Sequence, residues 1–405
     1  MSRISIFLLT FLFSICSGVT FAVPPQEALN SFLSSSGVPN GSMAVKIVDL
    51  KSKKVLASHN SSQPLIPASI MKSVTISTLL GETGPNWRYH TNVYTDGPVE
   101  MGKLKGNIVI VGSMDPSVHT PYEPYGTDLM EEIYNALYDQ HITAVEGDVI
   151  IDNSEFAGPS RPSSWAQGDH KTYYGTGSHA FNYANNVVNK AAVENPGAIF
   201  AKNLKTKLKE KGIPVEATYI APGKRTRLLD HASPSVDEIM RSCMMRSDNL
   251  FAECMIRTYG KLSGGDGSTA DAAKRETGYL KSKGYPMEGV NIVDGSGLSR
   301  QNRVTADFMA AMLQNMSKDV NYASFFPLAG QEGTMKKFLA GTVLDSYIAM
   351  KTGSMNGIQC YAGYKLNDDY EPTHVIVIIM NDLKDRDKAK RTLQQMLIDI
   401  FDEAA

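Results

Sequence analysis

The sequence lacks the features that mark several large classes of protein. Its 405 residues include four cysteines and two tryptophans, with no Cys-x-x-Cys or His-x-x-x-His pair to indicate a metal site. Lysine and arginine number 40 against 42 aspartates and glutamates, so no strongly basic surface points to nucleic acid or to an anionic membrane. With 42% hydrophobic and 20% charged residues, the chain is expected to be globular and to hold two or three domains.

Long apolar runs are also scarce, and the first one is typical of a targeting signal. A short positive start at residues 1–3 precedes the apolar stretch 4–15, and Thr20-Phe21-Ala22 forms a small-x-small cleavage site. This pattern predicts a signal peptide over residues 1–22 and export of the mature protein to a periplasm. The later run at 374–380 has the length of a strand, so no stable membrane span is expected after the signal is removed.

A single Ser-x-x-Lys stretch, Ser69-Ile70-Met71-Lys72, stands out in the rest of the chain. At this spacing the two side chains share one face of a helix, so the lysine amine can approach the serine hydroxyl. The surrounding residues are apolar, and burial disfavours the charged ammonium form of a lysine. A neutral lysine beside a serine is an activated nucleophile, although a core helix with a lysine that reaches solvent would show the same pattern.

Two further polar triplets follow in the order that such a site requires. Ser247-Asp248-Asn249 precedes an apolar run and is expected at the start of a helix. Lys351-Thr352-Gly353 is followed by Ser354 and lies in a strand pattern interrupted by glycine, which is typical of an edge strand that another backbone approaches closely. Ser-x-x-Lys, Ser-x-Asn and Lys-Thr-Gly in this order occur in penicillin-binding proteins and class A β-lactamases.

With the longer segments 246–250 and 294–300, the three motifs resemble those of the D-alanyl-D-alanine carboxypeptidase/endopeptidases among the class C low-molecular-mass penicillin-binding proteins. The resemblance implies a serine peptidase that cleaves D-alanyl-D-alanine, and also D-alanyl cross-links, in peptidoglycan. Its partners would be peptidoglycan stem peptides and cross-links, with β-lactam antibiotics as covalent inhibitors and no cofactor or metal.

The residues of the motifs have distinct expected roles. Ser69 is the nucleophile and Lys72 its base, while Ser247 relays a proton to the leaving amine. Asn249 holds the substrate amide, and Lys351 presents positive charge to a substrate carboxylate and depresses the charge on Lys72. By resemblance, the N–H groups of Ser69 and Ser354 form the oxyanion hole. The remaining expected substrate-binding residues are Thr352, Gly353, Arg300 and Asn356.

The expected fold is an α/β (α+β) sandwich like that of serine transpeptidases and β-lactamases, with one antiparallel sheet flanked by helices. Residues 23–85 and 225–405 form the peptidase domain, and 86–224, where short β-like runs alternate with turns, form an inserted β-rich domain. Roughly 180 residues separate Ser69 from Ser247, which is room for a whole domain.

Other functions share parts of this pattern. A class A β-lactamase needs a glutamate followed four residues later by asparagine between the second and third motifs, and no glutamate there has that partner. A related esterase would usually carry tyrosine in place of Ser247, and an inactive peptidoglycan-binding scaffold would not need all the polar groups of the three motifs.

Of the three cysteines beyond the signal, Cys243 and Cys254 are expected to be buried free thiols, while a disulfide from Cys360 stays open.

Overall fold

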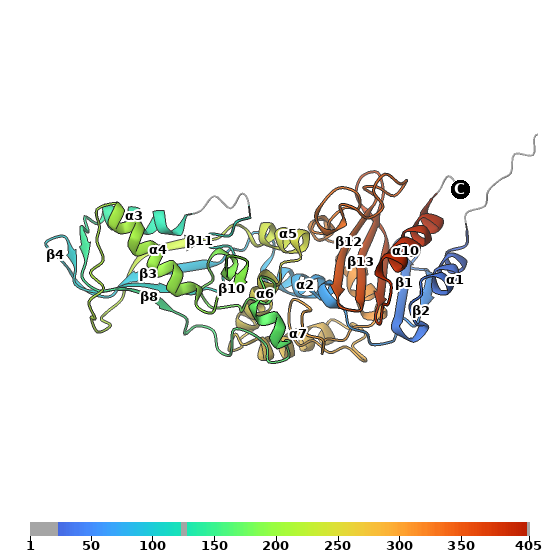
Figure 1. The fold of residues 1–405 in the computed structure, drawn as a ribbon, viewed down its shortest axis with the longest axis horizontal. Coiled ribbons are helices and arrows are strands. Elements are labelled where there is room, and N and C mark those ends of the chain that lie inside the picture. The colour runs from blue at the N-terminus through green and yellow to red at the C-terminus, as the bar shows by residue number, and fades with distance from the viewer. Residues whose placement is uncertain (1–22, 123–127, 403–405) are drawn as a thin grey trace, which may run out of the picture.

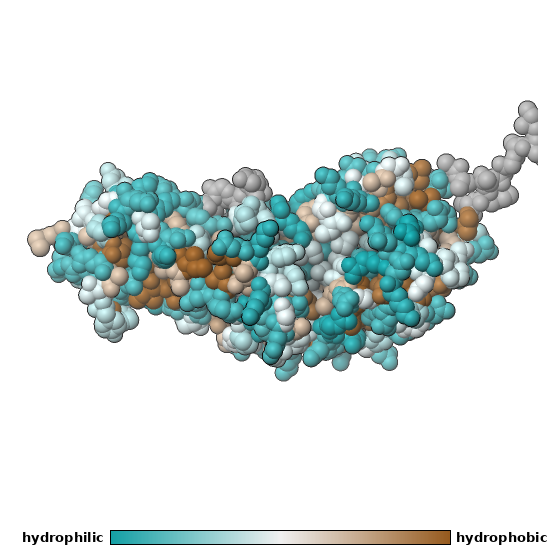
Figure 2. All heavy atoms as spheres, in the orientation of Figure 1, coloured by the Kyte–Doolittle hydropathy of each residue, from teal (hydrophilic) through white to brown (hydrophobic). Residues whose placement is uncertain are grey.

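The computed structural model describes residues 23–122 and 128–402, and the predicted signal peptide lies outside these residues. The molecule is elongated, with a five-stranded sheet at one end, an inserted β-rich part at the other, and a group of helices between them (Figure 1). Among the described residues no helix has the length and apolar character needed to cross a membrane. The visible face is mainly hydrophilic, with separate apolar patches over both ends of the molecule (Figure 2).

The two ends of the chain build the five-stranded antiparallel sheet, in the order β12-β13-β14-β1-β2. Its strands are β1 (Met43–Asp49), β2 (Val55–His59), β12 (Ile348–Met355), β13 (Ile358–Leu366) and β14 (Pro372–Met380). β1 pairs with β14 in a continuous register from Met43 opposite Met380 to Asp49 opposite His374. The N- and C-terminal segments therefore share one sheet, and the strand with the Lys-Thr-Gly motif, β12, lies at its edge, as the sequence predicts.

Both faces of this sheet are buried, which explains why β14 is apolar almost throughout. Ile376, Ile378 and Met380 pack in one core with α1 (Pro25–Ser35) and α10 (Arg386–Phe401). The alternate residues Val375, Val377 and Ile379 belong to a second core, on the side of the central helices. The strand period of two thus divides one apolar run between two layers of helices.

The central helices fill this second core and carry the first two motifs. They are α2 (Met71–Thr83), α5 (Val236–Arg246), α6 (Asn249–Leu262), α7 (Thr269–Ser282), α8 (Ala306–Met316) and α9 (Val320–Ser324), preceded by the 3-10 turn η2 (Ala68–Ile70). Two further 3-10 turns lie outside this core: η1 (Asn40–Ser42), directly before β1, and η5 (Gly333–Met335), whose Met335 packs in the first core. α2 is buried on nearly all sides, because it packs among α5, α6, α7 and α8. A buried helix of this kind provides the low-dielectric setting expected around Lys72.

The inserted part has its own sheets and its own hydrophobic core. A four-stranded sheet in the order β11-β3-β6-β8 packs against two helices, and smaller sheets and turns complete the insert. The elements are β3 (His90–Thr95), β4 (Val99–Glu100), β5 (Lys103–Leu104), β6 (Ile108–Val111), α3 (Leu129–Asp139), β7 (Ala144–Val145), β8 (Val149–Asp152), η3 (Gln167–Lys171), η4 (Ala184–Asn186), β9 (Val187–Val188), β10 (Ala191–Ala192), α4 (Pro196–Glu210) and β11 (Thr226–Ala232).

The insert sheet runs further along the chain than the expected end at residue 224. β11 pairs with β3 from Thr226 opposite Thr95 to Ala232 opposite His90, so this strand belongs to the insert sheet. The segment 225–232 carries polar residues on both sides of its two leucines, and its membership follows from pairing with β3 rather than from local pattern. We place the boundary after Ala232.

The cysteines Cys243, Cys254 and Cys360 are buried free thiols. The prediction for Cys243 and Cys254 is confirmed, and the disulfide left open for Cys360 is not formed. Cys243 and Cys254 lie on separate helices, because α5 ends at Arg246 and α6 begins at Asn249.

Candidate active site

Ser69 lies in the short turn η2, directly before α2 begins at Met71. The preceding residue, Ala68, has φ 47, a left-handed backbone conformation that is costly for a residue with a Cβ atom. Gly297 packs against this turn so closely that a Cβ there would lie 1.9 Å from the Ala68 carbonyl oxygen. Neighbouring backbone therefore holds the strained turn that presents Ser69 at the start of the helix.

Lys72 is fully buried and its amine contacts three oxygen atoms. Nζ donates to Ser69 Oγ at 3.0 Å, to Asn249 Oδ1 at 2.6 Å and to the Ser296 carbonyl at 2.7 Å. A neutral amine has two hydrogens and one lone pair. When the hydrogens bind the amide oxygen and the carbonyl, the lone pair faces the Ser69 hydroxyl and can accept its proton.

Electrostatics favour this neutral form of Lys72. Complete burial lowers the pKa of Lys72, and nearby acidic groups, including Cys243 and Asp248, oppose that shift without reversing it. Burial, and after it the positive charge of Lys72, lowers the pKa of Lys351 well below that of an ordinary lysine. The positive charge of Lys72 thus disfavours the charged form of the buried Lys351 amine.

The Ser-x-Asn motif connects the two lysines. Asn249 contacts Lys72, while Ser247 Oγ accepts a hydrogen bond of 2.8 Å from Lys351 Nζ. Ser247 ends α5 with φ 58, and Asp248 caps α6 by accepting from Phe251 N at 3.1 Å. The sharp break between the helices therefore directs Ser247 and Asn249 to different partners from almost one point in the chain.

Asn249 has its amide group fixed in one orientation. Its oxygen accepts from Lys72, and its Nδ2 donates to the Tyr174 carbonyl of the insert at 2.8 Å. An amide nitrogen carries two hydrogens, so one remains for a substrate carbonyl. Tyr174 is a site residue that the sequence did not reveal, because its contribution is a backbone carbonyl from another part of the fold.

The third motif approaches Ser69 through a glycine. A Cβ at Gly353 would lie 2.6 Å from the Pro67 carbonyl oxygen and 3.0 Å from Ser69 N, so only glycine fits the contact between β12 and η2. Thr352 Oγ1 is 2.9 Å from Thr334 Oγ1 of η5, and Ser354 is exposed on the same strand. Thr334 was not singled out in the sequence, since it lies 18 residues before its partner and in no motif.

Arg300 and Asn356 lie together at an exposed rim. The Arg300 guanidinium donates to the Asn356 backbone carbonyl at 3.3 Å. Asn356 follows the last residue of β12, Met355, in the turn before β13. The structure thus brings these two predicted residues into contact, with the side chain of Arg300 bound to the backbone of Asn356.

A cavity of about 470 Å³ opens beside Ser247, Asp248 and Asn249. The insert supplies aromatic walls to it, and Tyr122 from this wall donates to Asp248 Oδ2 at 2.6 Å. Residues from the insert that line it include Tyr122, Tyr173, Tyr174, Asn185 and Lys190. The insert therefore borders the groove at the second motif.

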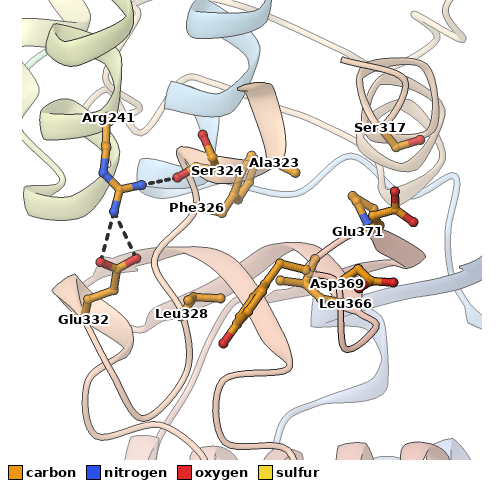
Figure 3. Close-up of a pocket in the computed structure, with 12 residues that line it drawn as sticks. Arg241, Ser317, Ala323, Ser324, Phe326, Leu328, Glu332, Leu366, Asp369 and Glu371 are labelled. Atoms are coloured by element: carbon orange, nitrogen blue, oxygen red, sulfur yellow. Dashed lines mark hydrogen bonds and ion pairs between the residues drawn. The ribbon is translucent and has the colours of Figure 1, made fainter. Parts of the chain in front are cut away.

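A larger cavity of about 670 Å³ lies elsewhere and contains no residue of the three motifs. Figure 3 shows Arg241 at its edge, directed at Glu332 with 3.2 Å between Nη2 and Oε2, and at the Ser324 carbonyl. Cavity size alone would therefore have indicated the wrong place. Within residues 23–122 and 128–402, no group of three or more His, Cys, Asp and Glu side chains is placed to hold a metal ion.

Known proteins resemble this chain over most of its length. A curated relative, the D-alanyl-D-alanine carboxypeptidase DacB of Haemophilus influenzae, is 23% identical over 91% of this chain and 90% of its own. Carboxypeptidase Rv3627c of Mycobacterium tuberculosis is 26% identical over 80% of this chain and 73% of its own.

Solved structures share the fold. Penicillin-binding protein 4 (dacB) from Haemophilus influenzae superposes with a TM-score of 0.76 at 19% identity, covering 93% of this chain and 98% of its own. The penicillin G-acylated Bd3459 predatory endopeptidase from Bdellovibrio bacteriovorus, in complex with immunity protein Bd3460, has a TM-score of 0.54 at 17% identity over 87% of this chain and 89% of its own.

The family model of the D-Ala-D-Ala carboxypeptidase 3 (S13) family matches this chain over residues 26–192 and 182–400. These segments take in all three motifs and the insert between the first two. The chain therefore belongs to the D-Ala-D-Ala carboxypeptidase 3 (S13) family.

Proposed function

We propose that this protein is an exported, periplasmic serine DD-peptidase that removes the terminal D-alanine of peptidoglycan stem peptides and also cleaves D-alanyl cross-links. The observation that carries the proposal is the buried amine of Lys72, 3.0 Å from Ser69 Oγ and held by two further acceptors. Membership of the S13 family supports the carboxypeptidase reaction. The structural similarity to a penicillin G-acylated endopeptidase and to penicillin-binding protein 4 in complex with a β-lactam supports the cross-link reaction and penicillin binding.

Acylation is the first half of the reaction. Ser69 Oγ attacks the carbonyl carbon between two D-alanines, and its proton passes to Lys72. The N–H groups of Ser69 and Ser354 stabilise the oxyanion. As the C–N bond breaks, Ser247 relays to the leaving amine the proton that Lys72 took from Ser69, so Lys72 is again a neutral base for deacylation. Lys351 holds the Ser247 hydroxyl in place for this transfer through its hydrogen bond.

Substrate binding and deacylation complete the cycle. Asn249 donates its free amide hydrogen to the substrate, and Lys351, Thr352 and Ser354 face the terminal carboxylate. Gly353 keeps the strand close to Ser69, while Arg300 and Asn356 contact the stem peptide at the rim. Water then attacks the Ser69 ester, so the shortened peptide leaves as a carboxylate and the serine regains its proton.

A labelled penicillin tests the proposal. Mass spectrometry of the purified protein is expected to show one long-lived adduct at Ser69, and none in Ser69→Ala. Rapid turnover of the drug would instead indicate a β-lactamase, and the absence of any adduct would indicate a binding scaffold. Defined muropeptides with and without a cross-link then measure the two peptidase activities separately.

A further inference from the structure

The Ser296 carbonyl is one of the two acceptors that orient the Lys72 amine. Because it belongs to a loop, residues 294–300, its position depends on what holds that loop. Thr75 on α2 donates to the Gly295 carbonyl at 2.9 Å, and Asp294 accepts the Gly297 and Ser299 amides from within the loop. These bonds shape the loop but do not bind Ser296 itself.

The side chain of Glu253, on α6, binds the backbone amide of Ser296. Its Oε1 accepts the Ser296 N–H at 2.8 Å, on the residue whose carbonyl contacts Lys72. Glu253 follows Asn249 by four residues, so both project from one face of α6. One helix thus supplies both acceptors of Lys72, directly through Asn249 and indirectly through Glu253 and Ser296.

We propose that Glu253 is a positioning residue for acylation, which holds the Ser296 amide so that the Ser296 carbonyl directs the Lys72 lone pair at Ser69. The inference rests on the proposed roles of Ser69 and Lys72. It assigns a function to a side chain that touches neither the substrate nor the nucleophile.

Stability does not explain a carboxyl group at this place. Glu253 is fully buried, and its second oxygen, Oε2, has no hydrogen-bond partner among the described residues. Burying such a group costs free energy that an apolar side chain of similar size would not. A residue that costs stability next to a reaction centre is expected to contribute to the reaction.

The surroundings of Glu253 determine how its charge acts. The titratable and charged groups that face it are Lys72 on α2, Asp294 in the loop, Arg257 on α6, and the thiols of Cys243 and Cys254. Burial, and after it the charge of Asp294, raises the pKa of Glu253 to about 8. In its ionised form Glu253 raises the pKa of Lys72 and so opposes the neutral base.

Two substitutions separate the hydrogen bond from the charge. Glu253→Gln keeps an oxygen acceptor for Ser296 and removes the charge, whereas Glu253→Ala removes both. The measurement is the rate constant of penicillin acylation per folded molecule, across pH. We expect Glu253→Ala to be slower by about tenfold or more at every pH, as misplacement of a catalytic group predicts.

Glu253→Gln is expected to recover most of the rate below about pH 8, where the wild-type carboxyl is also uncharged. Above about pH 8, where the wild-type carboxyl is ionised, the acid limb should shift toward lower pH, because Lys72 there loses a neighbouring negative charge. Glu276→Gln is the matched control. Glu276 is also buried and lies on α7 with neither carboxyl oxygen hydrogen-bonded within the described chain, and its replacement should leave the rate and profile unchanged.

Wild-type rates in both Glu253 variants would overturn the proposal, and so would equal slowing in both. If Glu253→Ala does not fold, Glu253→Leu, which also removes the acceptor for the Ser296 amide but fills more of the space, takes its place in the comparison with Glu253→Gln. Failure of the proposed function would look different from failure of this inference. In that case the wild type would form no penicillin adduct, or Ser69→Ala would still form one.

Discussion

The proposed role of Lys72 as a base depends on its three oxygen contacts and on its complete burial. The nearest acceptor, Asn249 Oδ1 at 2.6 Å, and the Ser296 carbonyl at 2.7 Å both require hydrogens from the amine. Only an amine that can lose a proton then offers a lone pair to Ser69. The chemistry at the residue scale therefore depends on the low pKa of this side chain as well as on its position.

Replacement of Lys72 by arginine tests this dependence. Arginine carries a permanent positive charge, because a guanidinium is not deprotonated in proteins, and its planar group is broader than the amine that it would replace. We expect Lys72→Arg to reduce penicillin acylation by about a thousandfold or more, as the loss of a general base implies. Lys46→Arg, at the ion pair with Asp307, is the control and should acylate normally. A similar rate in Lys72→Arg would contradict the assignment of the base.

At the scale of elements, the site depends on the contact between the edge strand β12 and the turn η2. The distances around Gly353 show that the two backbones meet with no room for a methyl group. An edge strand can approach a neighbouring turn in this way because only one of its sides is paired in the sheet.

Gly353→Ala is therefore expected to push β12 away from Ser69 and to slow acylation by about tenfold to a hundredfold, as displacements near 1 Å do. The control is Gly278→Ala on α7, where a Cβ meets no other atom within 4 Å. That variant should unfold at higher urea concentration, with a gain of about 1 kcal/mol in the free energy of unfolding, and should acylate as the wild type does. Normal acylation by Gly353→Ala would show that the close approach is unnecessary.

At the scale of the whole molecule, the insert has its two ends side by side. His90 and Ala232 are paired in β3 and β11, and the Ser233 amide donates to the Tyr89 carbonyl at 3.0 Å. The hydrophobic core of the insert is separate from the two cores of the peptidase part. A segment with adjoining ends and its own core is expected to fold by itself.

We expect the isolated segment 88–234 to be folded and to unfold cooperatively in urea, as followed by circular dichroism. A full-length chain in which this segment is replaced by a short glycine-serine linker should lose the Tyr174 contact to Asn249 and acylate more slowly. A segment that is unstructured alone would contradict the boundary after Ala232.

Buried carboxyl groups make the stability of the molecule depend on pH. Burial raises the pKa of Glu276 to about 8, above its value near 4.5 in an unfolded chain, so the folded state binds the proton more tightly. Its contribution to stability is therefore full below about pH 4.5 and is lost as the pH rises toward about 8.

Glu276→Gln should remove this loss. The variant is expected to be more stable than the wild type in urea at about pH 9, with a smaller difference at about pH 5, while the exposed Glu288→Gln serves as control. Glu253 has the same direction of shift, so the pH dependence should become weaker rather than vanish. Parallel stability profiles of wild type and Glu276→Gln would contradict a neutral buried Glu276.

The sequence predicted much of this architecture, because periodicity and motif spacing are local properties. The strand pattern around Lys351, for example, is the edge strand β12. β11 was not predicted as part of the insert, since its only support is pairing with β3, more than 100 residues earlier in the chain.

The amino-acid sequence by itself determined the candidate reacting groups, because the proposed nucleophile, the proposed base and their polar partners all lie in three short motifs. Only the tertiary structure decided what holds them: the Tyr174 carbonyl on Asn249, Thr334 on Thr352, and Glu253 on Ser296. These partners act through backbone atoms or across long separations in the chain. No local pattern records such contacts, since they arise when the folded chain encloses the buried amines and satisfies their hydrogen bonds.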